Sequence, residues 1–204
     1  MVHYKLTYFD LRGRAESIRQ VFAVAGVEFD DVRIAREDWP TLKPSTPFGQ
    51  IPVLEVDGKQ LAQSTSILRF LGRTFNLAGK TPLEDAKLDM IIDQFNDLYN
   101  DIRPYFMVLM GFAQGDKEKL KAEVFIPARD KHFSVLKKFL NGQSYILNDH
   151  LTWADIHIAE MISSIASKIP DAFDGFPELN AYKEKVQSIP KLRKYLAARP
   201  DAPF

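Results

Sequence analysis

The sequence predicts a small mixed α/β domain followed by a larger domain built from helices. Alternating apolar residues and a hairpin signal, both typical of strands, lie before residue 75. A short segment, 76–82, follows and has the turn-forming composition of a linker. Beyond it, apolar residues recur at helical spacing through most of the remaining chain. We therefore assign 1–75 to the first domain, 76–82 to the linker and 83–204 to an all-α C-terminal domain.

The composition excludes several classes of function. The 204 residues include 27 Lys and Arg and 27 Asp and Glu, so the formal net charge is zero. Proteins that bind nucleic acid by neutralising phosphates need a basic excess, and so do anchors to anionic membranes. No apolar run approaches the ~18 residues of a membrane span, and no secretory signal is visible. We expect a cytoplasmic protein with no nucleic-acid or membrane partner.

The chain contains no cysteine. This excludes disulfides, thiolate metal ligands and thiol–disulfide exchange by the protein itself. The four histidines, at positions 3, 132, 150 and 157, do not have the spacing of metal ligands. We therefore expect no metal site.

The first domain is expected to run strand, helix, strand, loop, strand, strand, helix. Residues 4–8 alternate as in a strand, and a helix with one apolar face follows from Ala15 to a terminating Gly26. A second strand is expected over 29–34. Three prolines predict that 39–48 is mostly loop.

The end of the first domain carries a hairpin signal and a helix start. Two extended runs, 53–56 and 60–63, flank the pair Asp57-Gly58, which favours a tight turn. Ser64 has the position of a helix N-cap. The expected apolar face of that helix consists of Ile67, Leu68, Phe70 and Leu71.

Five helical segments are expected in the second domain. The first carries a long apolar stripe, and two more cover 117–140 and 152–169. Pro177 and Pro190 fit the first turns of two short C-terminal helices. Thr152 and Asp155 form a capping box, which we assign to folding. The stripe consists of Leu88, Ile91, Ile92, Phe95, Leu98 and Ile102.

Several motifs together resemble the sigma-class glutathione S-transferases over the whole chain. They are Tyr-Lys-Leu-Thr-Tyr-Phe at 4–9, Arg-Gly-Arg-Ala-Glu at 12–16, the segment 47–58 with Phe-Gly-Gln-Ile-Pro, Gln-Ser at 63–64, and Thr-Trp-Ala-Asp at 152–155. The class includes detoxifying transferases and the haematopoietic prostaglandin D synthase. The resemblance implies a thioredoxin-like N-terminal domain that binds glutathione, a helical domain that completes a second-substrate pocket, and a homodimer, which is the glutathione transferase architecture.

The resemblance assigns the chemistry to Tyr8 and Arg14. Tyr8 ends the first strand, and its hydroxyl would donate a hydrogen bond to the glutathione thiolate, lowering the pKa of that thiol. Arg14 would orient or polarise the site with its permanent charge. Periodicity alone favours a packed core tyrosine at position 8. The alternative for Arg14 is a surface arginine at a helix start.

The resemblance also implies the glutathione-binding residues. A helix N-terminus suits a carboxylate, and a cis bond before Pro52 would turn the Ile51 backbone toward the tripeptide. An acid on the long helix would reach the glutathione of the neighbouring subunit. The sequence pattern alone, without the family resemblance, indicates a solvated helix residue at Asp97 and a solvated lysine at Lys43. The implied set is Tyr8, Trp39, Lys43, Gln50, Ile51, Pro52, Gln63, Ser64 and, across the dimer, Asp97.

The second-substrate pocket is expected to be apolar and flexible, which suits varied electrophiles. An aromatic and methionine stripe of this kind is also common in an ordinary core. The candidates are Phe9, Leu11, Arg14, Tyr105, Phe106, Met107, Met110 and Phe204. The prostaglandin synthase has a divalent-cation site near Asp93 and Asp97, but Asn96 stands between them here, so we expect no metal there.

The function implied is conjugation of glutathione to small hydrophobic electrophiles, as in detoxification, with glutathione as co-substrate. Two alternatives stay open. One is glutathione-dependent isomerisation of prostaglandin H to D, which 103–115 disfavours because it aligns poorly with the mammalian synthase. The other is a non-catalytic ligand-binding or structural relative, which the joint presence of Tyr8, Arg14, Gln63, Ser64 and Asp97 disfavours.

Overall fold

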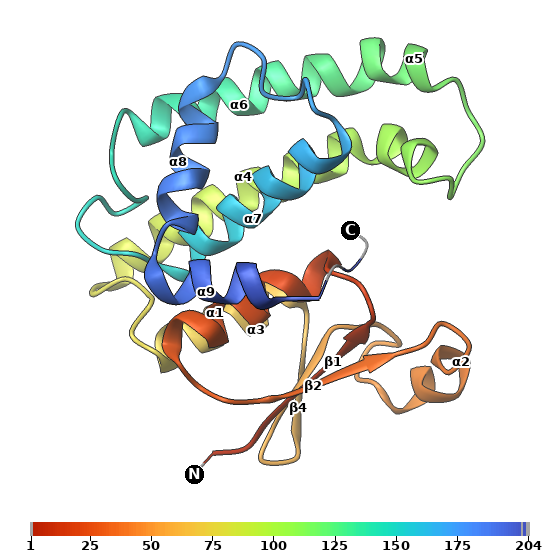
Figure 1. Cartoon of the computed structure of the whole chain (residues 1–204), viewed down its shortest axis with the longest axis vertical. Coiled ribbons are helices and arrows are strands. Elements are labelled where there is room, and N and C mark those ends of the chain that lie inside the picture. The colour runs from red at the N-terminus through yellow and green to blue at the C-terminus, as the bar shows by residue number, and fades with distance from the viewer. Residues whose placement is uncertain (1, 201, 203–204) are drawn as a thin grey trace.

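The computed structural model, which describes residues 2–200 and 202, has a sheet domain and a helical domain stacked on each other (Figure 1). The four strands are β1 (Tyr4–Phe9), β2 (Asp30–Ile34), β3 (Val53–Val56) and β4 (Lys59–Ala62). Their order in the sheet is β2-β1-β3-β4, with β1 parallel to β2 and antiparallel to β3. The strand pattern confirms the predicted mixed α/β domain.

The β3–β4 hairpin confirms the turn predicted at Asp57-Gly58. Both residues have positive φ, 49° and 79°, as a two-residue type I′ turn requires. Because only these two residues form the turn, β4 begins at Lys59 and ends at Ala62, one position earlier than the sequence predicts.

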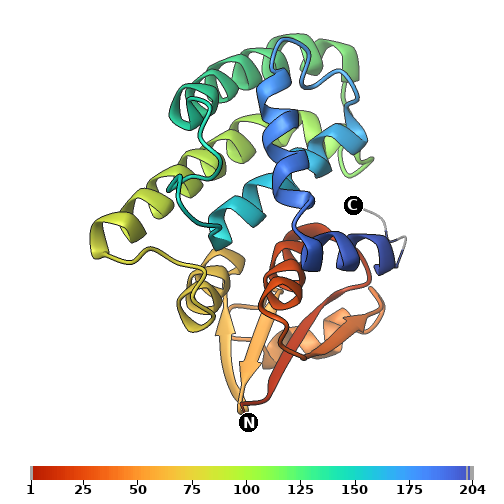
Figure 2. The ribbon, with the colours of Figure 1, turned by 60° about the vertical axis from the view of Figure 1, so that its left-hand side comes forward.

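Two helices cover the face of the sheet that is turned toward the helical domain (Figures 1 and 2). They are α1 (Glu16–Ala25), which ends at a left-handed Gly26, and α3 (Ser64–Thr74). Phe70 departs from the predicted apolar face of α3, because 36% of it is exposed.

The cap of α3 is Gln63, not Ser64 as the sequence predicts. The Gln63 carbonyl already accepts the first helical hydrogen bond, from the Ile67 N–H at 2.9 Å. Gln63 has φ 71° and its side chain makes no capping bond. Ser64 is therefore the first helical residue, with its backbone N–H at the open end of the helix.

The segment expected to be mostly loop is partly helical. It forms α2 (Trp39–Leu42) and a 3₁₀ turn, Lys43–Ser45. Pro40 and Pro44 lie in the first turns of these elements. A first-turn residue needs no intrahelical N–H bond, so proline starts a short helix here rather than preventing one.

The second domain confirms the predicted all-helical architecture. Its elements are α4 (Pro82–Leu109), α5 (Lys117–Leu120), α6 (Ile126–Leu140), α7 (Trp153–Lys168), α8 (Pro177–Gln187) and α9 (Pro190–Ala198), with a π-helical turn, Lys121–Phe125, between α5 and α6. The apolar stripe predicted on the first of them is buried in α4. Helix α4 begins at Pro82, the last residue of the predicted linker, behind a Thr81–Glu84 capping box. No helix in this part of the chain is long and apolar enough to cross a membrane.

The two domains meet through α1 and α3 on one side and α7 and α9 on the other. Trp153, only 2% exposed, lies so close to Gly72 of α3 that a Cβ there would be 2.3 Å from its indole ring. Buried polar pairs also cross this interface, including Gln20 Nε2 to Glu160 Oε2 at 2.6 Å. Dense packing and paired polar groups therefore hold the two domains in one relative position.

Asp155 organises the start of α7 from inside the core. Its carboxylate accepts from the Ile146 and Thr152 N–H groups, both at 2.8 Å, and from the Thr152 and Tyr182 hydroxyls, both at 2.6 Å. Burial raises the pKa of Asp155 against the lowering effect of these bonds. The capping box predicted from sequence is confirmed, and it also ties α7 to α8.

Replacing Asp155 by alanine should destabilise the fold far more than removing an exposed cap. The Asp155→Ala change leaves four buried donors unpaired, so we expect a loss of about 3–5 kcal/mol in the free energy of unfolding. Glu84→Ala, in the exposed capping box of α4, should cost ~1 kcal/mol. Urea unfolding of both variants measures the difference, and equal losses would contradict the role given to Asp155.

Candidate functional site

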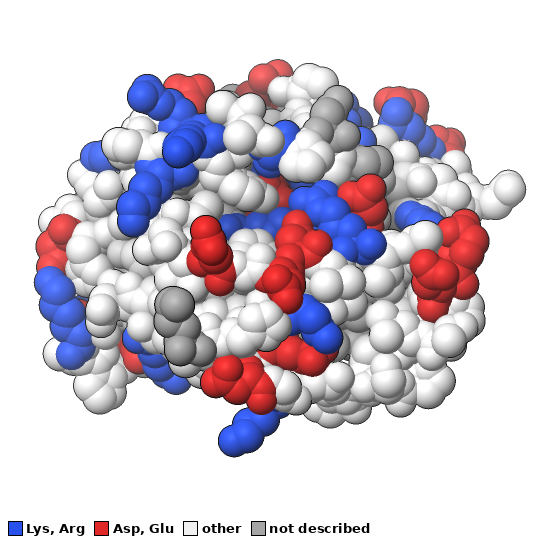
Figure 3. Space-filling model, turned by 60° about the horizontal axis from the view of Figure 1, so that its bottom comes forward, with Lys and Arg blue, Asp and Glu red and all other residues white. Residues whose placement is uncertain are grey.

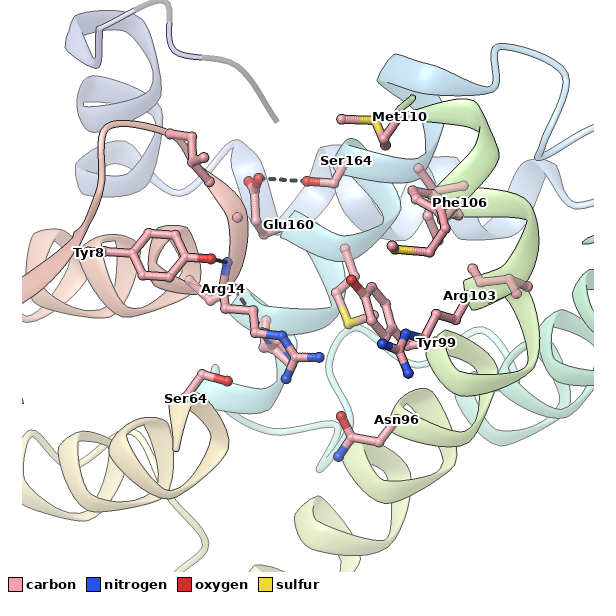
Figure 4. Close-up of a pocket in the computed structure, with 18 of the residues that line it drawn as sticks. Tyr8, Arg14, Ser64, Asn96, Tyr99, Arg103, Phe106, Met110, Glu160 and Ser164 are labelled. Atoms are coloured by element: carbon pink, nitrogen blue, oxygen red, sulfur yellow. Dashed lines mark hydrogen bonds between the residues drawn. The ribbon is translucent and has the colours of Figure 1, made fainter. Parts of the chain in front are cut away.

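A cavity of about 620 Å³ lies between the two domains (Figure 4). One wall comes from the end of β1, the turn before α1 and the start of α3, and the other from α4 and α7. Its wall residues include Tyr8, Leu11, Arg14, Ser17, Ser64, Asn96, Tyr99, Arg103, Phe106, Met107, Met110, Phe112, His157, Glu160, Met161 and Ser164. The end of the cavity near β1 and α3 is lined mainly by polar groups, whereas α4 and α7 contribute both polar and apolar ones.

Tyr8 presents its hydroxyl at the end of β1. The oxygen accepts a hydrogen bond from the Arg14 N–H at 3.2 Å. Burial raises the pKa of Tyr8, and the Arg14 N–H and charge oppose that rise only in part. The phenol therefore stays protonated at neutral pH. Its proton has no acceptor within residues 2–200 and 202, so Tyr8 keeps a free donor.

Gly13 makes the approach of Arg14 to Tyr8 possible. Its φ is +40°, and a Cβ at this position would lie 2.7 Å from the Tyr8 oxygen and 2.6 Å from Leu11 Cδ1. A residue with a side chain would thus be strained and would push the phenol aside. The Arg-Gly-Arg sequence at 12–14 therefore shapes the turn under the hydroxyl.

Arg14 extends its side chain into the cavity (Figure 4). Its guanidinium carbon lies 5.1 Å from the centre of the Tyr99 ring, a cation–π distance. The ring supports the guanidinium without neutralising it, so its charge remains available to an anion in the cavity.

Only some of the residues expected to bind glutathione line the cavity. Ser64 lines it at the first turn of α3 and is 8% exposed. The Ile51-Pro52 bond is cis, as the sequence resemblance implies. Trp39, Lys43, Gln50 and Gln63 lie outside its wall; the Trp39 ring packs on Phe9 with centroids 5.9 Å apart, and the other three are exposed.

Asp97 lies outside the cavity on an exposed face of α4. Its side chain makes no hydrogen bond or ion pair with any residue that the structure describes. Its helical neighbour Asp93 is 3.3 Å from Arg69. In the described part of the chain, no three His, Asp or Glu side chains are grouped to hold a metal ion.

Five of the eight residues expected in the second-substrate pocket line the cavity: Leu11, Arg14, Phe106, Met107 and Met110. Tyr105 does not, because it is 2% exposed and packs on Phe125 with centroids 5.3 Å apart. Phe9 instead packs against Tyr8 and Trp39. Phe204 lies outside the described residues.

Sequence reasoning missed the polar residues that two helices turn into the cavity. On α4 they are Asn96, Tyr99 and Arg103; on α7 they are His157 and Glu160. Both sets have helical spacing. The signal available was a polar stripe on α7, a helix whose other positions are mostly apolar.

Glu160 is part of a buried ionic cluster at the wall of the cavity. It accepts from Gln20, from Ser164 at 3.0 Å and from Arg199 at 3.4 Å, and Arg199 also meets Glu16 at 2.8 Å. Burial, and then the Glu16 charge, raise the pKa of Glu160. Because its oxygens are occupied, Glu160 is a structural group of the wall.

Surface charges of opposite sign occur close together. Figure 3 shows acidic and basic side chains interspersed over one face. Arg33, for example, lies 3.0 Å from Asp10 and 2.9 Å from Asp31. At such sites opposite charges are paired locally, in addition to balancing over the whole sequence.

Comparison with known proteins assigns the chain to a family. Residues 4–73 match the glutathione S-transferase N-terminal domain and residues 100–199 the C-terminal domain. The chain is 53% identical to glutathione S-transferase 1 of Ascaris suum, over the full length of both. A monomeric glutathione S-transferase of Necator americanus is 53% identical, with a TM-score of 0.94 over 99% of this chain and 100% of that one.

Class membership is less sharply defined. A Nu-class glutathione S-transferase of Haemonchus contortus is 52% identical, with a TM-score of 0.92 over the whole of both chains. Rat prostaglandin D synthase is more distant, 34% identical with a TM-score of 0.86 over 99% of this chain and all of that one. The fold, the Tyr8 cavity and the full-length matches agree: the chain belongs to the glutathione S-transferase family and uses glutathione as its co-substrate.

Proposed function

We propose that Tyr8 donates a hydrogen bond to the sulfur of bound glutathione and so keeps it ionised for attack on an apolar electrophile. A thiol of pKa ~8.5 is only about 3% ionised at pH 7. A donor aimed at the thiolate favours the charged form, and each unit of pKa corresponds to ~1.4 kcal/mol. The unshared proton of Tyr8 is the observation that carries this proposal. The Arg14 charge beside it supports the same anion.

The proposed position of glutathione follows from the polar end of the cavity. One carboxylate would meet the open N–H groups at the start of α3 and the Ser64 hydroxyl. Gln63 lies next to that carboxylate, and the backbone of Ile51, before Pro52, would pair with the tripeptide. Trp39, Lys43 and Gln50, which lie outside the cavity wall, would contact the glycyl end, as the family resemblance implies. The other half of the cavity would hold the electrophile against Phe106 and Met110.

We also propose a homodimer in which α4 meets its partner. Leu83 is 68% exposed and Met90 56% exposed. Together with Asp97, they recur every seven residues on one outer face of α4, and unpaired apolar groups at such spacing favour a helix partner. Asp97 would then contact glutathione bound to the neighbouring subunit. The monomeric Necator americanus relative is the competing arrangement.

The finer class is proposed to be sigma, and the location cytoplasmic. The detoxifying role rests on the mixed apolar and cationic cavity, which suits varied small electrophiles.

Isomerisation of prostaglandin H to D uses the same thiolate and is the alternative. Incubation with prostaglandin H should give no excess of the D product over an enzyme-free control; a large, glutathione-dependent excess would favour the isomerase.

The Tyr8→Phe variant should lose most of the conjugation rate while it still binds glutathione. Removing one donor from a developing or stabilised anion typically costs on the order of 10²-fold in rate. Conjugation of an aryl halide measures kcat, and the midpoint of its pH profile should move to higher pH because the bound thiol loses its donor. Glutathione binding, measured separately by calorimetry, should weaken much less.

Tyr4→Phe is the matched control, since Tyr4 lies on the same strand and is 5% exposed. It should keep the rate and pH profile of the unmodified protein. A Tyr8→Phe enzyme with full activity at neutral pH would show that another group activates the sulfur.

Mixing two impaired variants tests the shared site. In a dimer of one Tyr8→Phe chain and one Asp97→Ala chain, the second chain keeps its tyrosine and receives Asp97 from the first. One site of each mixed dimer should therefore recover normal KM for glutathione, which steady-state kinetics after refolding together would detect. Activity that is only the average of the two variants, or a monomeric mass by light scattering, would contradict the shared site.

A further inference from the structure

A serine–histidine pair lies in the wall of the cavity and has no part in the proposed activation of glutathione. His157 comes from α7 and Ser17 from α1, so each domain supplies one member. The Ser17 oxygen is 2.9 Å from His157 Nδ1. Both residues line the cavity that contains Tyr8 and Arg14.

The hydrogen bond with Ser17 determines which nitrogen of His157 carries the proton. Burial, followed by the nearby Arg14 charge, lowers the pKa of His157 to about 4, so the ring is neutral at pH 7. Ser17 is 3% exposed, and its only side-chain bond within the described residues is to His157. If Nδ1 were the donor, the serine proton would be buried without an acceptor. Ser17 therefore donates to Nδ1, and the ring proton is on Nε2.

The Nε2–H group is an unpaired donor on the α7 wall. It makes no hydrogen bond with the residues that the structure describes. Its polar neighbours on the same helix, Glu160 and Ser164, bond to each other at 3.0 Å. A ligand in the cavity would thus find the imidazole free on this wall.

We propose that His157, oriented by Ser17, contacts the second substrate and makes the enzyme selective for electrophiles that carry a carbonyl oxygen conjugated to a carbon–carbon double bond. This inference rests on the proposed function, because it needs a glutathione thiolate in the same cavity. It adds a polar determinant from α7 to a pocket whose α4 wall has both polar and apolar side chains.

Addition of the thiolate to such an electrophile places negative charge on the carbonyl oxygen, where a hydrogen-bond donor such as His157 would stabilise it. The thiolate sulfur forms a bond to the β-carbon, the carbon–carbon π bond breaks, and its electron pair moves toward the carbonyl oxygen. Nε2–H stabilises the negative charge that develops there. Water then protonates the α-carbon, and the hydroxide that remains combines with the proton released when the glutathione thiol ionised, so atoms and charges balance.

The test compares two electrophiles, an α,β-unsaturated aldehyde and benzyl chloride, which contains no oxygen. In His157→Leu, the ratio of kcat/KM for the aldehyde to that for benzyl chloride should fall about tenfold. His157→Gln, which retains an N–H donor, should recover much of that ratio. Ser17→Ala should lower it less than His157→Leu does. Ser167→Ala, on α7 outside the cavity wall, should leave it unchanged.

Nuclear magnetic resonance gives an independent readout. Long-range ¹H–¹⁵N spectra of the unmodified protein at pH 7 should show His157 protonated on Nε2; protonation on Nδ1 would overturn the inference. So would an unchanged rate ratio in a folded His157→Leu enzyme, or equal losses in the Leu and Gln variants. An unmodified protein that conjugates neither electrophile would overturn the proposed function, and this inference with it.

Discussion

The proposed activation of glutathione depends on the contact between the Tyr8 oxygen and the Arg14 N–H. Because a backbone group occupies the acceptor side of the phenol, its proton is directed elsewhere. The contact needs the left-handed Gly13 between β1 and α1, since any Cβ there would collide with the phenol. Burial raises the pKa of Tyr8, so the phenol keeps the proton that the proposed mechanism directs at the thiolate. A strand end, one turn and one helix start therefore produce the donor.

The second requirement is a rigid contact between the domains, because each domain supplies one wall of the cavity. Two polar pairs join α1 to α7: Gln20 with Glu160, which is buried, and Ser17 with His157, which is part-buried. Close packing of Trp153 on Gly72 joins α7 to α3. Paired polar groups of this kind specify one arrangement, because a displaced helix would leave them without partners. The contacts that join the domains thus also set the separation between Tyr8 and the α4 and α7 walls of the cavity.

Local signals in the sequence predicted most of the fold, whereas the site needed knowledge of long-range packing. The Asp57-Gly58 turn and the Thr152–Asp155 cap depend on neighbouring residues, and both were confirmed. Tyr105 and Phe106 show why the pocket residues were harder to predict. Side chains at adjacent helical positions point about 100° apart, so only Phe106 reaches the cavity. His157 was read only against metal-ligand spacing, because its partner Ser17 is 140 residues away. Glutathione itself came from family resemblance, since no local pattern specifies a tripeptide.

A crystal structure of the protein with bound glutathione would show which group meets the sulfur. We expect the sulfur to lie within hydrogen-bonding distance of the Tyr8 hydroxyl while that oxygen still accepts the Arg14 N–H. A sulfur far from Tyr8, with a different donor beside it, would show that Tyr8 does not activate glutathione.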